Sequence, residues 1–131
     1  MLEISLDELE IGHKPEEYRF KGKHFSGKAK DIESGKLIWE CEFLDGCKHG
    51  EEITYDEDGN VIESMNFYKN YPNGSYISRK NNEEVKSEYV LGVLFKSEKK
   101  IDGMIVFNYE IDENSSGYKL IENRKKRMGV T

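Results

Sequence analysis

The first half of the chain contains two similar consecutive segments, from Phe25 to Cys47 and from Lys48 to Tyr71. Corresponding residues lie 23 to 24 positions apart: Gly27 and Gly50, Gly35 and Gly59, Trp39 and Glu63, Phe43 and Phe67. A third copy begins near Gly74. Self-similarity at a fixed spacing of this length is typical of proteins built from repeated structural units.

Each unit alternates apolar and polar residues over short runs. One side of the clearest run carries Leu37, Trp39, Cys41 and Phe43, and the other carries Glu40 and Glu42. Successive side chains leave a strand by opposite faces, so this alternation predicts half-buried β-strands. Glycine-containing turn signals at 33–36, 45–46, 56–60 and 71–74 separate the runs. We therefore expect consecutive hairpins that join into one antiparallel β-meander, a mostly all-β fold.

The length of 131 residues fits a single domain. We divide it into a lead-in at 1–17, hairpin repeats at 18–96, a degenerate terminal hairpin with an edge strand at 97–123, and a basic tail at 124–131. Apolar residues, with glycine counted and tyrosine left out, make up about 39% of the chain, below the usual 45–50%. The core is therefore expected to be thin, which stacked hairpins tolerate.

The two ends of the chain are less regular than its middle. Ser5 and Glu8 match a capping box, which predicts a short helix over about 6–11, with an irregular lead-in as the alternative. Near the C-terminus, residues 102–111 predict a last hairpin with Ile105, Phe107, Tyr109 and Ile111 in the inward register. Residues 112–117 indicate a loop, and 118–121 indicate an edge strand.

Charge is distributed unevenly. The formal net charge is −6, although Arg124 to Arg127 are four basic residues in a row. Setting these four of the 20 basic residues aside leaves 16 against 26 acidic residues, a formal charge of −10. An acidic body favours a basic partner and disfavours nucleic acid and anionic membranes. Only the basic run offers a contact to nucleic acid or to a membrane surface.

No motif for catalysis or for a cofactor stands out. Cys41, Cys47 and His49 are a possible zinc set, but their spacing is wrong for zinc and a fourth ligand is lacking. His24 and His49 each come shortly before a repeat glycine, without a recognisable nucleophile motif. Three carboxylates in a row at 56–58 are typical of a solvated turn. We expect no enzyme activity, no metal and no cofactor.

Targeting signals are not visible either. The start, Met1-Leu2-Glu3, lacks the basic and apolar regions of a signal peptide. No apolar run approaches the roughly 18 residues of a membrane span. Two cysteines are too few for a disulfide framework, which agrees with a reducing compartment. A cytoplasmic location is the resulting expectation.

A resemblance to a known family rests on the residues from about 18 to 96. Its marks are Tyr18-Arg19-Phe20-Lys21-Gly22-Lys23-His24-Phe25-Ser26-Gly27, then Asp31, Gly35-Lys36-Leu37, Phe43, Gly46, His49-Gly50, Tyr55-Asp56 and Gly59. This string resembles the MORN-type repeat, and more narrowly the divergent variant found in YwqK-type antitoxins of bacterial toxin systems. The third copy departs from the pattern because Asn81 and Asn82 stand where the earlier turns carry glycine.

The resemblance implies a non-enzymatic antitoxin or immunity protein that binds and blocks a basic toxin, with a nuclease as one candidate class, through an acidic sheet surface. The candidate partner-binding residues are Glu40, Glu42, Glu51, Glu52, Tyr55, Asp56, Asp58, Glu63, Tyr68 and Tyr71. Carboxylates would steer the partner and tyrosines would anchor it. The alternative is a general scaffold for protein or membrane-surface attachment. Either way we expect a monomer or a weak homo-oligomer.

Overall fold

The structure is a computed structural model that describes residues 1–12, 14 and 17–129. Its elements are β1 (Glu3–Ser5), a 3-10 helix η1 (Leu6–Glu8), β2 (Glu10–Ile11), β3 (Tyr18–Phe20), β4 (Lys23–His24), β5 (Gly27–Glu33), β6 (Lys36–Leu44), β7 (Cys47–Tyr55), β8 (Val61–Tyr68), β9 (Tyr71–Lys80), β10 (Glu83–Val90), β11 (Val93–Ile101), β12 (Met104–Glu110) and α1 (Ser116–Met128). His13 and the last two residues of the predicted basic tail lie outside the described residues.

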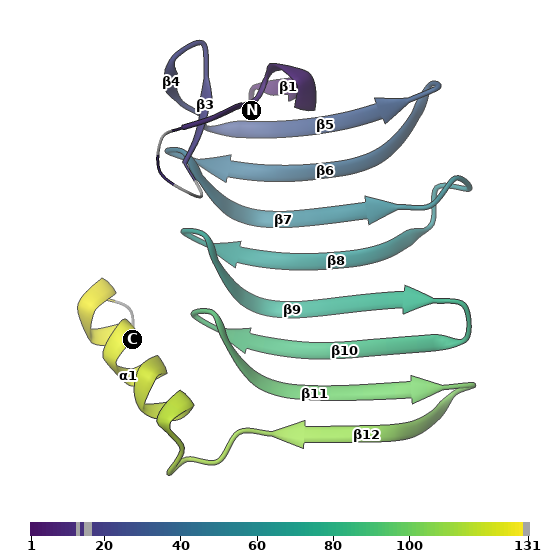
Figure 1. The fold of residues 1–131 in the computed structure, drawn as a ribbon, viewed down its shortest axis with the longest axis vertical. Helices are drawn as coiled ribbons and strands as arrows, with labels where there is room; N and C mark the ends of the chain where they lie inside the picture. The colour runs from purple at the N-terminus through teal and green to yellow at the C-terminus, as the bar shows by residue number, and fades with distance from the viewer. Residues whose placement is uncertain (13, 15–16, 130–131) are drawn as a thin grey trace.

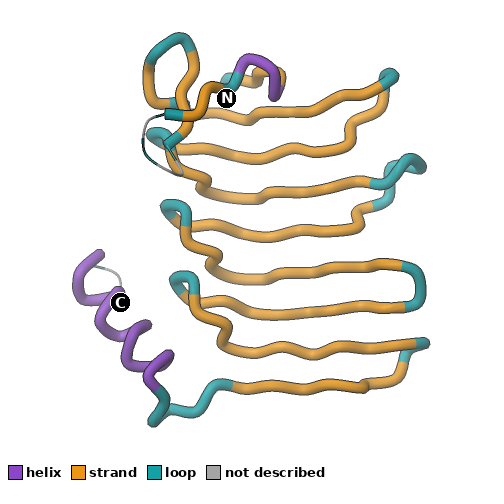
Figure 2. Tube along the Cα trace, in the orientation of Figure 1, coloured by secondary structure: helices purple, strands orange, loops and turns teal. Residues whose placement is uncertain are grey.

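The predicted meander is confirmed. Strands β5 to β12 follow one another in space as they do in sequence, each antiparallel to the next, and the turns gather at the two ends of the strands (Figures 1 and 2). In tight turns such as Ser34-Gly35, Asp45-Gly46 and Leu91-Gly92 both residues have positive φ. That conformation matches the twist of the flanking strands. One departure is β1, which pairs parallel to β5 and makes the nine-stranded sheet mixed.

The repeat glycines lie within strands. Gly27, Gly50 and Gly74 have φ of 151°, 108° and 104°, near the starts of β5, β7 and β9. A side chain at such φ is strained, which explains why glycine recurs there. The turn predicted at 71–74 is wrong by this account, because β9 already begins at Tyr71 and the turn lies at Lys69-Asn70.

The residue before each repeat glycine clamps the turn of the following hairpin. Its side chain accepts the backbone N–H of the first turn residue: Asp45 to Ser26 Oγ at 2.8 Å, Lys69 to His49 Nδ1 at 3.2 Å, and Leu91 to Asn73 Oδ1 at 2.9 Å. One position earlier, a backbone carbonyl accepts from the second turn residue: Gly46 to Phe25, Asn70 to Lys48, and Gly92 to Pro72. The same pair of bonds thus stacks each hairpin on its predecessor.

The core lies at the N-terminal end, on the side of the sheet that carries Trp39, Cys41 and Phe43, here called the tryptophan face. Cys41 and Phe43 are buried there together with Ile4, Phe25 and Ala29. The small sheet of β2, β3 and β4 supplies part of the cover, through Tyr18 and Phe20 packed against this cluster. Most residues of β8 to β11 are only half-buried, so the core is thin, as the composition predicts.

In the described part of the lead-in, the helix is a single 3-10 turn, η1. The predicted capping box is present, because Ser5 N–H donates to Glu8 Oε1 at 3.0 Å and the Ser5 hydroxyl accepts within the first turn. The helix ends at Glu8, however, and residues 10–11 form β2, so the expected helix over 6–11 is too long.

The C-terminal expectations need two corrections. Residues 118–121 belong to α1 and form no edge strand, and α1 also includes the basic run. Arg124 holds α1 on the sheet, since its Nη1 donates to the Leu91 carbonyl at 2.5 Å and its guanidinium lies 4.6 Å from the Tyr71 ring centroid. The inward register of β12 is also wrong, because all seven of its residues are exposed and only Ile111 beyond it is buried.

Candidate functional site

The strongest candidate site is an apolar groove of about 600 Å³ where β5, β6 and β7 approach the β7–β8 turn. Its lining residues are Leu6, Asp31, Ile38, Trp39, Thr54, Tyr55, Asp56 and Glu57. Strand register sets Asp31, Trp39 and Thr54 side by side on neighbouring strands. Leu6 comes from η1, which packs against β5. Four separate segments therefore build this groove.

Trp39 is held in place by a polar network. Its Nε1 donates to Glu52 Oε2 at 2.8 Å, and Lys48 Nζ lies 3.1 Å from both Glu52 oxygens. Burial is the largest single influence and lowers the pKa of Lys48, but the hydrogen bond to Glu52 and the Coulombic attraction of nearby groups, Glu52 first, together leave the pKa above its usual value. The ring is half-buried. A fixed, partly exposed indole is a good anchor for a partner because little side-chain entropy is lost on binding.

Carboxylates surround the apolar lining. Asp56 shapes the turn, since its Oδ1 accepts from the N–H groups of Asp58 and Asn60, both at 2.9 Å. The bond from the Asn60 backbone is the largest cause that lowers the pKa of Asp56. Glu57 and Asp58 are exposed, and Asp31 lies on the groove side of β5. The groove therefore combines an apolar surface with negative charge.

The Tyr55 hydroxyl points away from the polar network of Trp39, Glu52 and Lys48. Its hydroxyl donates to Glu40 Oε2 at 2.6 Å, and Glu40 leaves β6 on the face opposite Trp39. The hydrogen bond to Glu40 raises the pKa of Tyr55 to about 12. Burial raises the pKa of Glu40, but bonds from Tyr55 and from Lys28, at 3.0 Å, outweigh it and lower the pKa overall. Tyr55 is thus better placed to hold Glu40 than to anchor a partner.

The sequence-predicted site residues do not share one surface. Glu52 and Glu63 lie on the tryptophan face; Glu40, Glu42, Glu51 and Tyr55 lie on the opposite face; Asp56 and Asp58 lie in the β7–β8 turn; Tyr68 and Tyr71 flank the turn at the other end of the strands. Of these ten residues, Tyr55 and Asp56 line the groove. Tyr71 lies under Arg124, and Tyr68 packs on His49 with ring centroids 5.1 Å apart.

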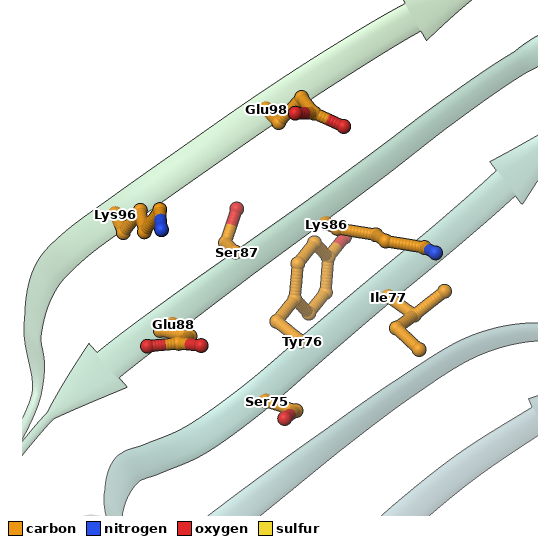
Figure 3. Close-up of a pocket in the computed structure, with 8 residues that line it drawn as sticks. All are labelled: Ser75, Tyr76, Ile77, Lys86, Ser87, Glu88, Lys96 and Glu98. Carbon is orange, nitrogen blue, oxygen red and sulfur yellow. The ribbon is translucent and has the colours of Figure 1, made fainter. Parts of the chain in front are cut away.

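A second hollow of about 300 Å³ lies on the face opposite Trp39 (Figure 3). Two cross-strand rows from β9, β10 and β11 frame it: Ser75, Glu88 and Lys96, and Ile77, Lys86 and Glu98. Two lysines and two glutamates face one another across these strands, so the charges of the rows balance. Cross-strand pairs of this kind stabilise sheets, and they give the hollow no preference for a charged partner.

His24 and His49 each have a hydrogen-bonding partner, and Cys41 is buried. His24 Nε2 lies 2.9 Å from Glu17 Oε1, and His49 accepts the Lys69 N–H described above. Burial raises the pKa of the Cys41 thiol to about 12. Among the described residues no three His, Cys, Asp or Glu side chains are grouped in a way that could hold a metal ion.

Asp31, Leu6 and Trp39 were not among the predicted site residues. The alternation places Trp39 on the apolar face of its strand. Trp39 is the single tryptophan of the chain, and this is the sequence feature that could have indicated a binding role. Leu6 offered no signal, because only the packing of η1 on β5 brings it to the groove.

Comparisons of the chain with protein-family models, with curated proteins and with solved structures give no match. Within the described part of the chain, no helix is both long and apolar enough to cross a bilayer. What the chain binds is therefore inferred from the chemistry of the groove itself.

Proposed function

We propose that this chain is a non-enzymatic antitoxin or immunity protein that binds a basic protein toxin at the groove and blocks it sterically. The observation that carries the proposal is the Trp39 indole, fixed by Glu52, beside the carboxylates of Asp31 and Glu57. An apolar side chain of the partner would pack on the indole. A neighbouring lysine or arginine of the partner would pair with the carboxylates.

The net charge supports the same class of partner. A formal charge of −6 attracts a basic protein over several ångströms and speeds the encounter, while the apolar groove slows dissociation. The resemblance to YwqK-type antitoxins supplies the biological class. The acidic residues on the opposite face are excluded from the contact and act only through their long-range field.

Charge reversal tests the proposal. Asp31→Lys with Glu57→Lys should abolish or strongly weaken capture of a basic protein from lysate of the native host. Glu88→Lys with Glu122→Lys changes the net charge equally at exposed positions away from the groove, and it should retain capture. The captured protein should inhibit growth when expressed alone, and co-expression of the wild-type chain should restore growth.

Three results would reject the proposal: equal capture by both double variants, a captured protein without toxicity, or toxicity that the chain does not relieve. Thermal unfolding of each variant should show that the fold is retained. A measured salt dependence of the association rate completes the test, since electrostatic steering falls with ionic strength.

One observation favours a second function, attachment to an acidic surface. Lys125, Lys126 and Arg127 form the last turn of α1, and Lys126 and Arg127 are exposed. Such a cluster suits an anionic membrane. Co-sedimentation with vesicles containing phosphatidylserine, compared between wild type and a Lys126→Glu/Arg127→Glu variant, would detect it. Absence of wild-type binding at low salt would eliminate this function.

A further inference from the structure

The outer edge of β12 is the least protected part of the sheet. Strand β12 ends the nine-stranded order, and no strand among the described residues pairs with its outer side. Its exposed apolar residues are Met104, Ile105, Val106, Phe107 and Tyr109, with Met104 72% and Phe107 52% exposed. Helix α1 lies beside the turns and leaves this edge open (Figure 1).

The opposite edge of the same sheet is protected. Strand β1 has three residues, and its Glu3 pairs with Lys30 at 3.1 Å. Short strands and charged side chains are the usual means by which proteins prevent edge-to-edge pairing. In β12 the six residues from Met104 to Tyr109 include no charge, no proline and no glycine. An edge of this composition is suited to pairing with another strand.

We infer that the occupant of this edge is a second copy of the same chain, paired β12 to β12 in antiparallel fashion about a two-fold axis. Every strand from β5 to β12 pairs antiparallel with its neighbour, and a two-fold axis perpendicular to the sheet continues that pattern. The tryptophan faces of both copies then lie on the same side of one continuous sheet.

Charge and side-chain pairing favour the antiparallel arrangement. Glu110 is the single charged residue of β12. Antiparallel pairing places the two copies of Glu110 at opposite ends of the interface, whereas parallel pairing would set them side by side. With the axis at Phe107, which lies beyond the β-bulge at Val106, each Phe107 meets the partner's Phe107. Aromatic and β-branched cross-strand pairs are the favourable ones.

The interface is small, so the association is expected to be weak. One seven-residue strand and five apolar side chains lie at the low end of specific interfaces, below about 1,200 Å² of buried surface. We therefore expect a reversible, transient dimer, since interfaces of this size are typical of weak encounters. The groove at the β5–β7 end stays open in both copies.

Sedimentation velocity of the full chain from about 5 to 500 μM tests this inference. Wild type should shift from monomer to dimer across that range. Phe107→Lys should weaken association at least tenfold, because it sets two like charges directly opposite each other across the axis. Ile32→Lys is the matched control: Ile32 is 59% exposed on β5, and its substitution should leave the dimer unchanged.

Hydrogen exchange distinguishes strand pairing from side-chain contact. Backbone amides of β12 that point outward should gain protection at high concentration in wild type and not in Phe107→Lys. A chain that stays monomeric at 500 μM, a dimer insensitive to Phe107→Lys, or a dimer without protection in β12 would each overturn the inference. None of these outcomes bears on capture of a toxin at the groove.

Discussion

The backbone N–H of Lys69 donates to Nδ1 of His49 at 3.2 Å, although the two residues lie in different hairpins. Ser26 and Asn73 accept the equivalent N–H one repeat earlier and one repeat later. Three different side chains thus accept the equivalent turn N–H. Each of them is a hydrogen-bond acceptor that directly precedes a repeat glycine. This bond gives His49 a place in the repeat architecture.

Two substitutions at His49 should separate its contributions. His49→Asn keeps the acceptor, as Asn73 does, and should change the free energy of unfolding little. His49→Phe keeps a ring on Tyr68 but removes the acceptor, and should cost about 1 kcal/mol. Urea unfolding midpoints measure both. A larger loss for His49→Asn than for His49→Phe would show that ring packing dominates.

Replacing Gly27 by alanine is expected to reduce the free energy of unfolding more than replacing Gly74. A Cβ at Gly27 would lie 2.3 Å from the Leu2 carbonyl oxygen, which accepts the Lys28 N–H that joins β1 to β5. At Gly74 the nearest atom is 3.5 Å away, so Gly74→Ala bears only the cost of its φ, about 1–3 kcal/mol. Gly27→Ala should cost more and should also raise hydrogen exchange at Lys28. Equal losses would contradict this account.

The core at the N-terminal end should dominate stability. Phe25 is buried against Phe43, with ring centroids 5.5 Å apart, and Phe25→Ala should cost about 3–5 kcal/mol. Ile32→Ala at an exposed position of β5 should cost about 1 kcal/mol or less. Chemical denaturation gives both values. Similar losses would show that the sheet is stabilised evenly along its length.

Acid should destabilise the small sheet of β2, β3 and β4 through Glu17, whose carboxylate contacts Arg19 and His24. Hydrogen bonds, first from Arg19 and then from His24, lower the pKa of Glu17 from 4.5 to about 2. A carboxyl whose pKa is depressed in the folded state stabilises the fold above pH 4.5, and this contribution is lost as pH falls toward 2. Glu17→Gln should therefore be less stable than wild type at pH 7 and approach it near pH 2. A constant difference at both pH values would refute the linkage.

The two thiols should react at different rates. The pKa of Cys41, raised by burial to about 12, leaves roughly one thiolate in 10⁴ at pH 8. A disulfide reagent should therefore label Cys47 first in the native protein. In a Cys47→Ser variant, labelling should be slow until denaturant is added. Prompt labelling of that variant without denaturant would show that Cys41 is accessible.

Much of the fold could be predicted because its signals are local. Alternation from Leu37 to Phe43 indicates a strand without reference to any partner, and Asp45-Gly46 indicates a turn through backbone preference alone. Local signals gave the wrong element at 118–121, which was predicted as a strand, because a run of four apolar and polar residues is compatible with either a strand or a helix. Ser115 as N-cap and the contacts of Arg124 on Tyr71 and Leu91 decide that case in favour of α1.

The candidate site could not be predicted in the same way, because its residues are distant in sequence and only strand register brings them together. Acidic character and aromatic content were visible in the composition, but whether Glu40 and Glu52 share a surface depends on which face each occupies. Strand register places them on opposite faces. Tyr55 and Tyr71 are also poorly placed as anchors, because the Tyr55 hydroxyl donates to Glu40 and the Arg124 guanidinium lies over the Tyr71 ring.

What the sequence determined by itself is the repeated hairpin, since alternation and turn residues act within one unit. Tertiary structure alone decided where α1 docks, which carboxylates meet Trp39, and that β12 keeps an open edge. The physical reason is that strand and turn preferences arise from neighbouring residues, whereas a groove or an exposed edge exists only after distant segments have packed.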